Sequence, residues 1–515
     1  MSKLLATKPL DQLLAEARSD GAHSLVRALG PYNLVSLGIG AVIGAGIFVF
    51  TGTAAAQFAG PAIILSFLLA GLGCAFAGLC YAEFAAMIPI SGSAYTYGYA
   101  TLGEIFAWII GWDLVLEYAF SSATVASGWS GTIVSLLQDF NVNLPPQLIE
   151  TPGSELVLFQ GRWTLLSVVL PAIKAAGINP DGLPHATALF NLPAFISILI
   201  VTTILVIGVK ESARFNTVVV FIKIATIIIF IAIAGAYLWQ NPGVFTNNWR
   251  EFIPENKGEF GQFGWSGIAR GASVIFFAYI GFDAVTTAAQ EAKNPQRDMP
   301  IGLLGSLAIC TILFLCVAVV LTGVLHYSQL NVAAPVALAV DAIGVKWGSL
   351  LVKLGSLAGL STVMLVTLMG QSRIFYAMSR DGLLPSWVSA IHPRFRTPWI
   401  SSIVVGLVVA TFSGLFPISV LGQLVSIGTL LAFVIVCAGV WVLRIKRPDM
   451  DRPFKAPWVP FTPLMGILIS LLLMASLPLD TWIRLIVWLL VGFLIYFGYS
   501  RRHSRVQATS AIEIV

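Results

Sequence analysis

The sequence predicts an all-α, polytopic membrane protein, because it is poor in charge and repeatedly apolar over long stretches. Of its 515 residues, 57% are apolar and 10% are charged, whereas about 25% are charged in a typical soluble domain. A helix needs about 20 apolar residues in a row to cross the hydrocarbon core of a bilayer, and runs of that length recur along the chain. A transmembrane barrel is disfavoured, since its strands would alternate apolar and polar residues.

The apolar runs predict about twelve spans, and spans one to five and six to ten are candidates for two equivalent halves. The expected order is a cytoplasmic N-terminal segment (1–31), a first half (32–239), an extracellular loop (240–264), a second half (265–443), spans eleven and twelve (444–499) and a cytoplasmic tail (500–515). The spans themselves are expected at residues 32–58, 61–88, 104–137, 190–208, 215–239, 265–289, 301–325, 347–378, 398–415, 418–443, 460–477 and 480–499.

The basic residues predict the orientation of these spans. If the N-terminus is cytoplasmic, about 20 of the Lys and Arg residues fall inside and about five outside, as the positive-inside rule requires. We therefore expect both termini in the cytoplasm and the chain in the plasma or inner membrane, without a removed signal peptide. The net charge of +5 then reflects topology and not a nucleic-acid partner. The five cysteines lie within apolar spans, so no disulfide framework and no metal site are expected.

The first span contains the glycine-rich stretch "GIGAVIGAGIF". Each glycine costs roughly 1 kcal/mol in a helix interior relative to alanine, so the cluster favours an interruption, which we place at Ile43, Gly44, Ala45 and Gly46. The half-helix after such a break presents free N–H groups and a positive dipole end, which suit a carboxylate. The alternative is that the glycines only permit close helix packing, for which Gly40 and Gly44 have the right spacing.

The sixth span, "SVIFFAYIGFDAVTTAAQE", is interrupted by a glycine and an aspartate at mid-membrane. Interrupted spans at corresponding positions of two halves point to the central site of a transporter. Carbonyl groups near Phe277, Ala278 and Ile280 would be acceptors for an ammonium group. One break suits an anion and the other a cation, and an L-amino acid carries both.

Four further residues are candidates for coupling or selectivity. Lys223 lies deep in span five, so it is either a proton carrier or a lysine that snorkels to the interface. Glu117, one turn from Asp113 in span three, could pair with a buried amine, relay a proton or cap a broken helix. Asp283 could hold the backbone amides of span six, the role we favour, or join the proton path. Met364 in span eight could line a side-chain pocket or simply pack in the core.

Three more charged residues have structural interpretations. Glu83, near the inner end of span two, is expected to anchor a cytoplasmic gate. Arg270 and Lys353, near the outer ends of their spans, are expected to snorkel.

Five motifs in order carry a resemblance to a known family: "GIGAVIGAGIF", "AAMIPISGSAYTYGYATLGE", "GWDLVLEYA", "FFAYIGFDAVTTAAQEAKNPQRDMPIG" and "RIFYAMSRDGLLP". Over residues 25–460 the chain closely resembles the cationic amino acid transporter family of the amino acid-polyamine-organocation superfamily, and its expected span number is typical of bacterial members. The resemblance implies a five-plus-five inverted repeat with spans one and six unwound. It also implies that residues 43–46 meet the substrate backbone, that the named span-six carbonyls do so too, and that Lys223 replaces the sodium ion of sodium-driven relatives.

The expected function is therefore secondary active L-amino acid transport by proton-coupled symport with alternating access. No acidic side chain is clearly placed to receive a cationic substrate, and Met364 would disfavour one, so neutral amino acids are at least as plausible. The alternatives are an amino acid or polyamine exchanger and, from a different class, an amino acid sensor. No enzyme motif is present. Protons are the expected coupling ion, and no cofactor is expected. The expected partners are the substrate and membrane lipid, and a small single-span accessory subunit is left open.

Overall fold

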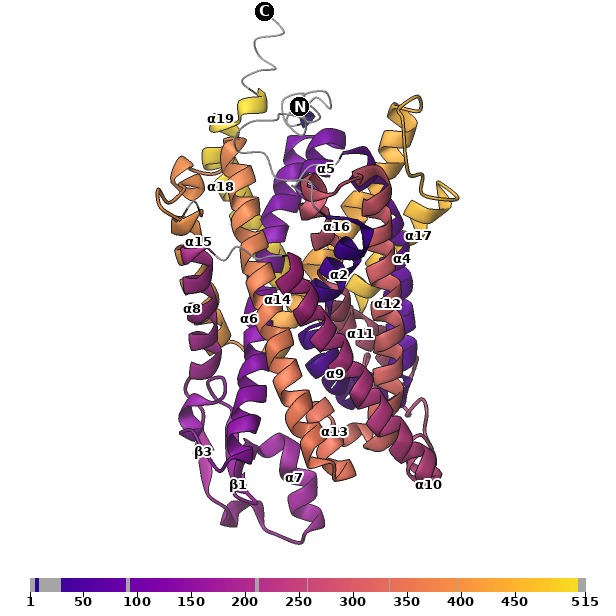
Figure 1. The fold of residues 1–515 in the computed structure, drawn as a ribbon, viewed down its shortest axis with the longest axis vertical. Helices are drawn as coiled ribbons and strands as arrows, with labels where there is room; N and C mark the ends of the chain where they lie inside the picture. Colours follow the sequence, from indigo (N-terminus) through magenta and orange to yellow (C-terminus); the bar gives the residue numbers. More distant parts are fainter. Residues whose placement is uncertain are drawn as a thin grey trace, which may run out of the picture.

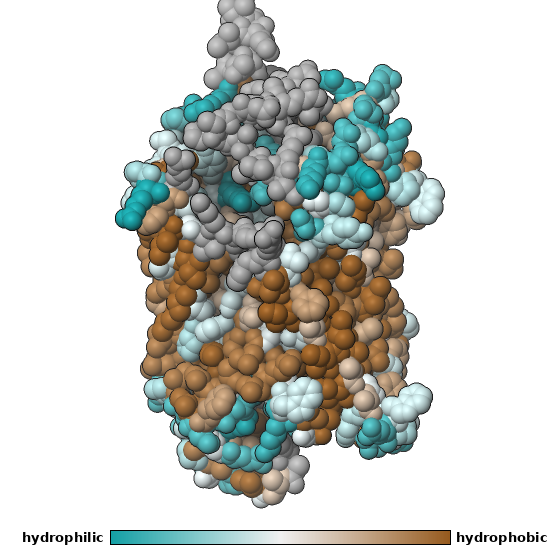
Figure 2. Space-filling model, viewed as in Figure 1, coloured by the Kyte–Doolittle hydropathy of each residue, from teal (hydrophilic) through white to brown (hydrophobic). Residues whose placement is uncertain are grey.

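The computed structural model describes residues 5–8, 29–88, 93–208, 213–256, 258–332, 334–395 and 397–507. These residues form an elongated bundle whose long helices run roughly along one axis (Figure 1). On the face shown in Figure 2, apolar side chains form a broad band around the middle and hydrophilic side chains gather at both ends. This is the distribution of an integral membrane protein, because only apolar side chains are favourable against lipid.

The helices follow the apolar runs of the sequence. The longer ones are α2 (Pro31–Val42), α4 (Ile63–Met87), α5 (Ser93–Thr101), α6 (Glu104–Asp139), α7 (Leu166–Ala175), α8 (Leu192–Ile207), α9 (Ala213–Gln240), α11 (Gly264–Ile275), α12 (Pro295–Val324), α13 (Pro335–Ile343), α14 (Lys346–Arg380), α15 (Trp399–Leu415), α16 (Ile418–Lys446), α17 (Phe461–Ser476) and α18 (Leu479–Ile495). The short ones are α3 (Thr51–Ala54), α10 (Pro242–Asn248) and α19 (Arg501–His503).

Eight helical stretches among the described residues are long and apolar enough to cross a membrane. Three further apolar helices, α8, α15 and α17, have 16 or 17 residues. The stretch Gly46–Met87 contains the end of the first predicted span and the whole of the second. The chain turns between them at Gly60, which has φ 60°. The helices thus coincide with the predicted ranges. The total of twelve membrane-spanning helices stays a prediction.

The expectation of an all-α protein is wrong in one place. The connection between α6 and α8 contains the strands β1 (Glu155–Phe159), β2 (Arg162–Leu165) and β3 (His185–Thr187), which form an antiparallel sheet in the order β2-β1-β3. With α7 they make a small lobe at one end of the bundle (Figure 1). The strands were missed because they are short and their apolar side chains pack only on a small local cluster, so the period-two pattern is weak.

The described residues nearest to the two ends of the chain lie together at the opposite end of the bundle. The Lys8 ammonium is 3.2 Å from the Asp381 carboxylate, and the Arg505 amide donates to the Asp381 carbonyl. Most of the predicted N-terminal segment (1–31) and the tail after Gln507 lie outside the described residues.

The first half-helix, α2, lies in the interior of the bundle. It packs against α9, α12 and α14, and residues 38–42 are all buried. This arrangement positions the glycine cluster at the centre of the molecule.

Candidate functional site

The first span is interrupted within the predicted window. Helix α2 ends at Val42, and Ile43 is extended, with φ −73° and ψ 100°. The helix resumes at Gly46 as a short π-helix to Phe50. The last carbonyls of α2 and the first amides of the next segment are the groups that a helix leaves without intrahelical partners.

The ammonium of Lys223, on α9, caps the C-terminal end of α2. Its ammonium donates to the carbonyl of Gly40 at 2.7 Å and to that of Ile43 at 3.2 Å. The side chain is completely buried, which contradicts the alternative of snorkelling. A cation at a helix C-terminus is favoured by the dipole, so the fifth span stabilises the interruption of the first.

The sixth span is also interrupted. Helix α11 passes into a 3-10 turn, Phe276–Tyr279, and the chain then opens at Ile280 (ψ 134°) and Gly281 before a second 3-10 segment, Asp283–Glu291. Gly281 has φ 107°, a conformation that side chains rarely adopt. The Phe277 carbonyl already accepts from the Ile280 amide at 3.2 Å. Within the described part of the chain, the Ala278 and Ile280 carbonyls have no such backbone partner.

The two interruptions are in direct contact. A Cβ added at Gly46 would lie 2.2 Å from the Cα of Ala278. The rings of Phe50 and Phe277 are in contact in a tilted arrangement, with 4.8 Å between their centroids. Such close approach is possible only because residue 46 has no side chain, so the glycines serve packing as well as the break.

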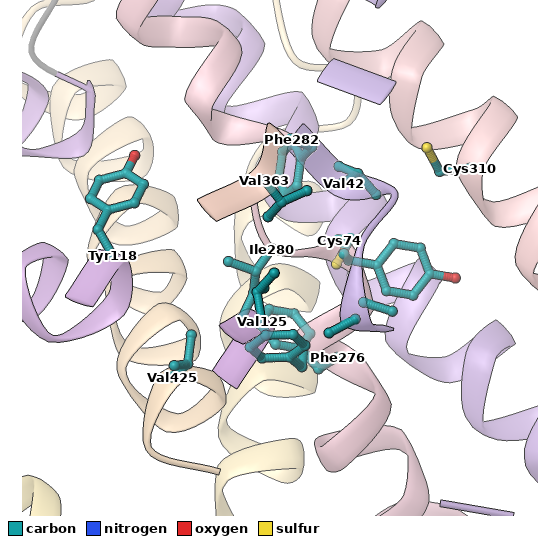
Figure 3. Packing of buried hydrophobic residues seen from close by; sticks show 14 of the residues in the cluster. Val42, Cys74, Tyr118, Val125, Phe276, Ile280, Phe282, Cys310, Val363 and Val425 are labelled. Atoms are coloured by element: carbon teal, nitrogen blue, oxygen red, sulfur yellow. The ribbon is translucent and has the colours of Figure 1, made fainter. Parts of the chain in front are cut away.

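Val363 of α14, the neighbour of the predicted Met364, contacts the first interruption. A Cβ at Gly44 would lie 3.1 Å from a Val363 methyl group, and Figure 3 shows Val363 among the buried residues around Val42 and Ile280. The Met364 sulfur instead accepts from the Ser197 hydroxyl of α8, at 3.8 Å. Its role in selectivity stays a prediction, and periodicity alone could not have separated these neighbours.

The predicted carboxylates lie apart from Lys223. Glu117 and Asp113 of α6 and Asp283 are each about 1% exposed, and Glu117 lies within electrostatic range of the other two. Among the described residues, both carboxylate oxygens of Asp113 and one of Glu117 have no hydrogen-bond partner. The Asp283 carboxylate instead lies against the backbone amides of Gly281 and Ala284 at the interruption of span six. Among the described residues, no buried amine pairs with Glu117, which was one of the three roles considered for it. Proton relay and helix capping stay predictions.

Three other charged side chains form ion pairs or hydrogen bonds at the ends of the bundle. Glu83 accepts from Arg444 at 3.0 and 2.7 Å and so links α4 to α16. Its role as the anchor of a cytoplasmic gate stays a prediction. Lys353 is buried and pairs with Asp139, so the expectation that it snorkels is wrong. Arg270 donates to the Ser476 carbonyl.

Comparison of the sequence with known proteins identifies the family of this chain. The family model described as amino acid permease matches residues 29–496. The chain is 44% identical to the "methylthioribose transporter" of Bacillus subtilis over 98% of its length and 99% of the relative, and 43% identical to the "branched-chain amino acid permease BcaP" of the same organism over 95% and 97%. It is 31% identical to "cationic amino acid transporter 4, vacuolar" of Arabidopsis thaliana over 98% and 96%. These relatives are named as transporters or permeases and not as enzymes, and the resemblance noted from the motifs is confirmed. The chain belongs to the amino acid permease family.

Proposed function

We propose that this protein is a secondary active transporter that carries neutral L-amino acids together with protons by alternating access. The observation that carries the proposal is the pair of interrupted spans in contact at the centre of the bundle. The start of one half-helix can offer amide donors and the open backbone of span six can offer carbonyl acceptors, which would suit the carboxylate and the ammonium of one amino acid. Residues 43–46 and the carbonyls of Ala278 and Ile280 are the proposed substrate contacts.

Three side chains beside these interruptions favour a neutral substrate. Val363, Phe277 and Phe50 are apolar and lie against the two breaks. An apolar wall binds an apolar side chain by burial, whereas a cationic one would leave an ammonium without a partner. The relative named as a branched-chain amino acid permease agrees with this choice. The relative named as a methylthioribose transporter supplies a second candidate substrate, which belongs in the same uptake panel.

Proton coupling is proposed through Lys223, with Glu117 and Asp283 as further proton-binding groups. The Lys223 ammonium stabilises the carbonyl end of α2 only while it carries its proton. Loss of the proton would weaken both hydrogen bonds and release α2 for a change of conformation. The proposed topology has twelve spans, an inverted repeat of five helices and both termini in the cytoplasm, in agreement with the basic residues of the sequence.

The test is uptake of labelled leucine into empty proteoliposomes that contain the purified full chain. An acid-outside gradient should drive accumulation without sodium, and Lys223→Ala should abolish it. Lys174→Ala is the matched control, because Lys174 is exposed in the lobe far from the site. Accumulation driven by sodium and insensitive to protons would contradict the proposal.

Two other outcomes identify the alternatives. An obligate exchanger would show uptake only when the vesicles are preloaded with unlabelled amino acid or polyamine. A sensor would bind leucine, as measured by a thermal shift, without accumulation under any gradient.

A further inference from the structure

A groove of about 680 Å³ lies between the start of α12 and the segment that joins α16 to α17. It is at the end of the bundle where the described chain ends lie, since the Lys293 amide donates to the carbonyl of Leu29, just before α2. Its wall includes the polar residues Asn294, Gln296 and Arg297 and the apolar residues Ile301, Leu304 and Phe454. The groove therefore has a polar and an apolar part, as an amphiphile requires.

The two parts are aligned along one face of α12. Arg297, Ile301 and Leu304 are spaced four and three residues apart, which places them on the same side of the helix. Leu304 lies about 10 Å deeper than Arg297 along the axis. Ile301 is 41% exposed and Ile312, two turns beyond Leu304, is 62% exposed, so the apolar face continues towards the middle of the bundle.

The polar end of the groove is positively charged. The exposed basic residues of the two segments are Lys293, Arg297, Lys446, Arg447 and Lys455, and the exposed acids are Asp449 and Asp451. The Asp298 carboxylate is buried and accepts from the Asn294 amide. It adds one negative charge next to Arg297, and the exposed basic residues still outnumber the acids. Arg444 and Arg452 both pair with Glu83, whose single negative charge offsets one of these two positive charges.

Aromatic residues place this end of the groove at the membrane surface. Trp458 is 76% exposed and Phe461 is 49% exposed, and both follow Phe454 in the segment that forms one wall. Aromatic side chains with this exposure are typical of the boundary between headgroups and hydrocarbon. Arg297 would then lie at headgroup depth and Leu304 at the level of the acyl chains.

We propose that this groove binds an anionic phospholipid, with its phosphate at Arg297 and an acyl chain along Ile301 and Leu304. Basic pockets beside helices attract such headgroups, with about 1 kcal/mol for each basic residue near the surface. The groove also borders the interrupted first span. A Cβ at Gly305, which lines the groove, would lie 3.1 Å from a methyl group of Val35 in α2. A bound lipid would therefore contact the residues that hold α2 in place.

The test is lipid binding to the delipidated full chain in detergent, measured by native mass spectrometry with dioleoyl phosphatidylglycerol and dioleoyl phosphatidylcholine. The wild type should bind the anionic lipid more tightly. Arg297→Gln should weaken that binding about fivefold, the equivalent of one surface charge. Arg250→Gln is the matched control, because Arg250 is exposed near the end of α10, at the opposite end of the bundle.

A second variant keeps the test valid if Arg297→Gln fails to fold. Leu304→Trp should fill the apolar part of the groove and reduce binding of the anionic lipid, with an unchanged melting temperature. Equal binding of the two lipids, equal loss in the Arg250 variant, or full competition by inorganic phosphate alone would overturn the proposal. The measurement needs no gradient, so its failure leaves the proposed transport untouched, and failure of transport leaves the lipid site standing.

Discussion

The contact between the two interruptions makes Gly46→Ala the most informative single substitution. The added methyl group would lie 2.2 Å from the Ala278 Cα and 2.4 Å from its Cβ, whereas carbon atoms in contact are ordinarily about 3.5–4.0 Å apart. The obstacle is mostly backbone, so no side-chain rotation relieves it, and the two interrupted spans must separate.

The expected cost follows from these distances. Overpacking of a buried site costs about 1–3 kcal/mol, and a backbone obstacle places this case at the upper end. The gain in helix propensity from glycine to alanine returns at most about 1 kcal/mol. A net cost of about 2 kcal/mol on the arrangement in which the two interrupted spans touch corresponds to a fall of roughly thirtyfold in transport rate, if that arrangement lies on the transport cycle.

Two matched variants give the scale of the effect. Gly44→Ala would meet only a Val363 methyl group, at 3.1 Å, which can shift by a few tenths of an ångström. Gly235→Ala in α9 would meet nothing within 4 Å. Initial uptake rates in proteoliposomes and melting temperatures in detergent should therefore fall most for Gly46→Ala, slightly for Gly44→Ala and not at all for Gly235→Ala. Wild-type uptake and stability in Gly46→Ala would refute the contact.

Three further predictions concern the ends of the bundle. Glu83→Gln should destabilise the detergent-solubilised protein by about 3 kcal/mol, since it leaves Arg444 without its charge partner. Asp449→Asn, at an exposed control position, should change the stability by less than about 0.5 kcal/mol. Equal losses of stability in the two variants would contradict the ion pair. Glu104→Gln should speed tryptic cleavage after Arg501, because the buried carboxylate accepts four hydrogen bonds, three of them from residues 496–507; unchanged cleavage would contradict this. Burial raises the pKa of Glu150 to about 7, against the opposing effect of the Thr151 amide. The folded lobe therefore binds the Glu150 carboxyl proton more tightly than the unfolded chain does. The protection of the lobe's backbone amides from hydrogen exchange should fall as pH rises from about 4.5 to 7, and Glu150→Gln should remove this pH dependence.

Much of the helical architecture could be predicted from the sequence, since burial in lipid requires long apolar runs and the twelve predicted ranges coincide with helices. The interruption at residues 43–46 could be predicted as well, because glycine weakens a helix through its own backbone and needs no tertiary partner. The strands of the 155–187 lobe could not, as their pattern is short and their core is local.

The partners of the buried side chains could not be predicted from the sequence. Lys223 was identified by its depth in an apolar run. Its acceptors, the carbonyls of Gly40 and Ile43, lie 183 and 180 positions away along the chain and can accept from it only because α2 ends there. Val363 and Met364 are neighbours on one helix, and only the position of α14 beside α2 decides which faces the break. The sequence by itself determined where the chain is apolar and where its helices are weak, since both are local properties. The tertiary structure decided which charged groups meet, because a hydrogen bond depends on positions that the packing of distant helices sets.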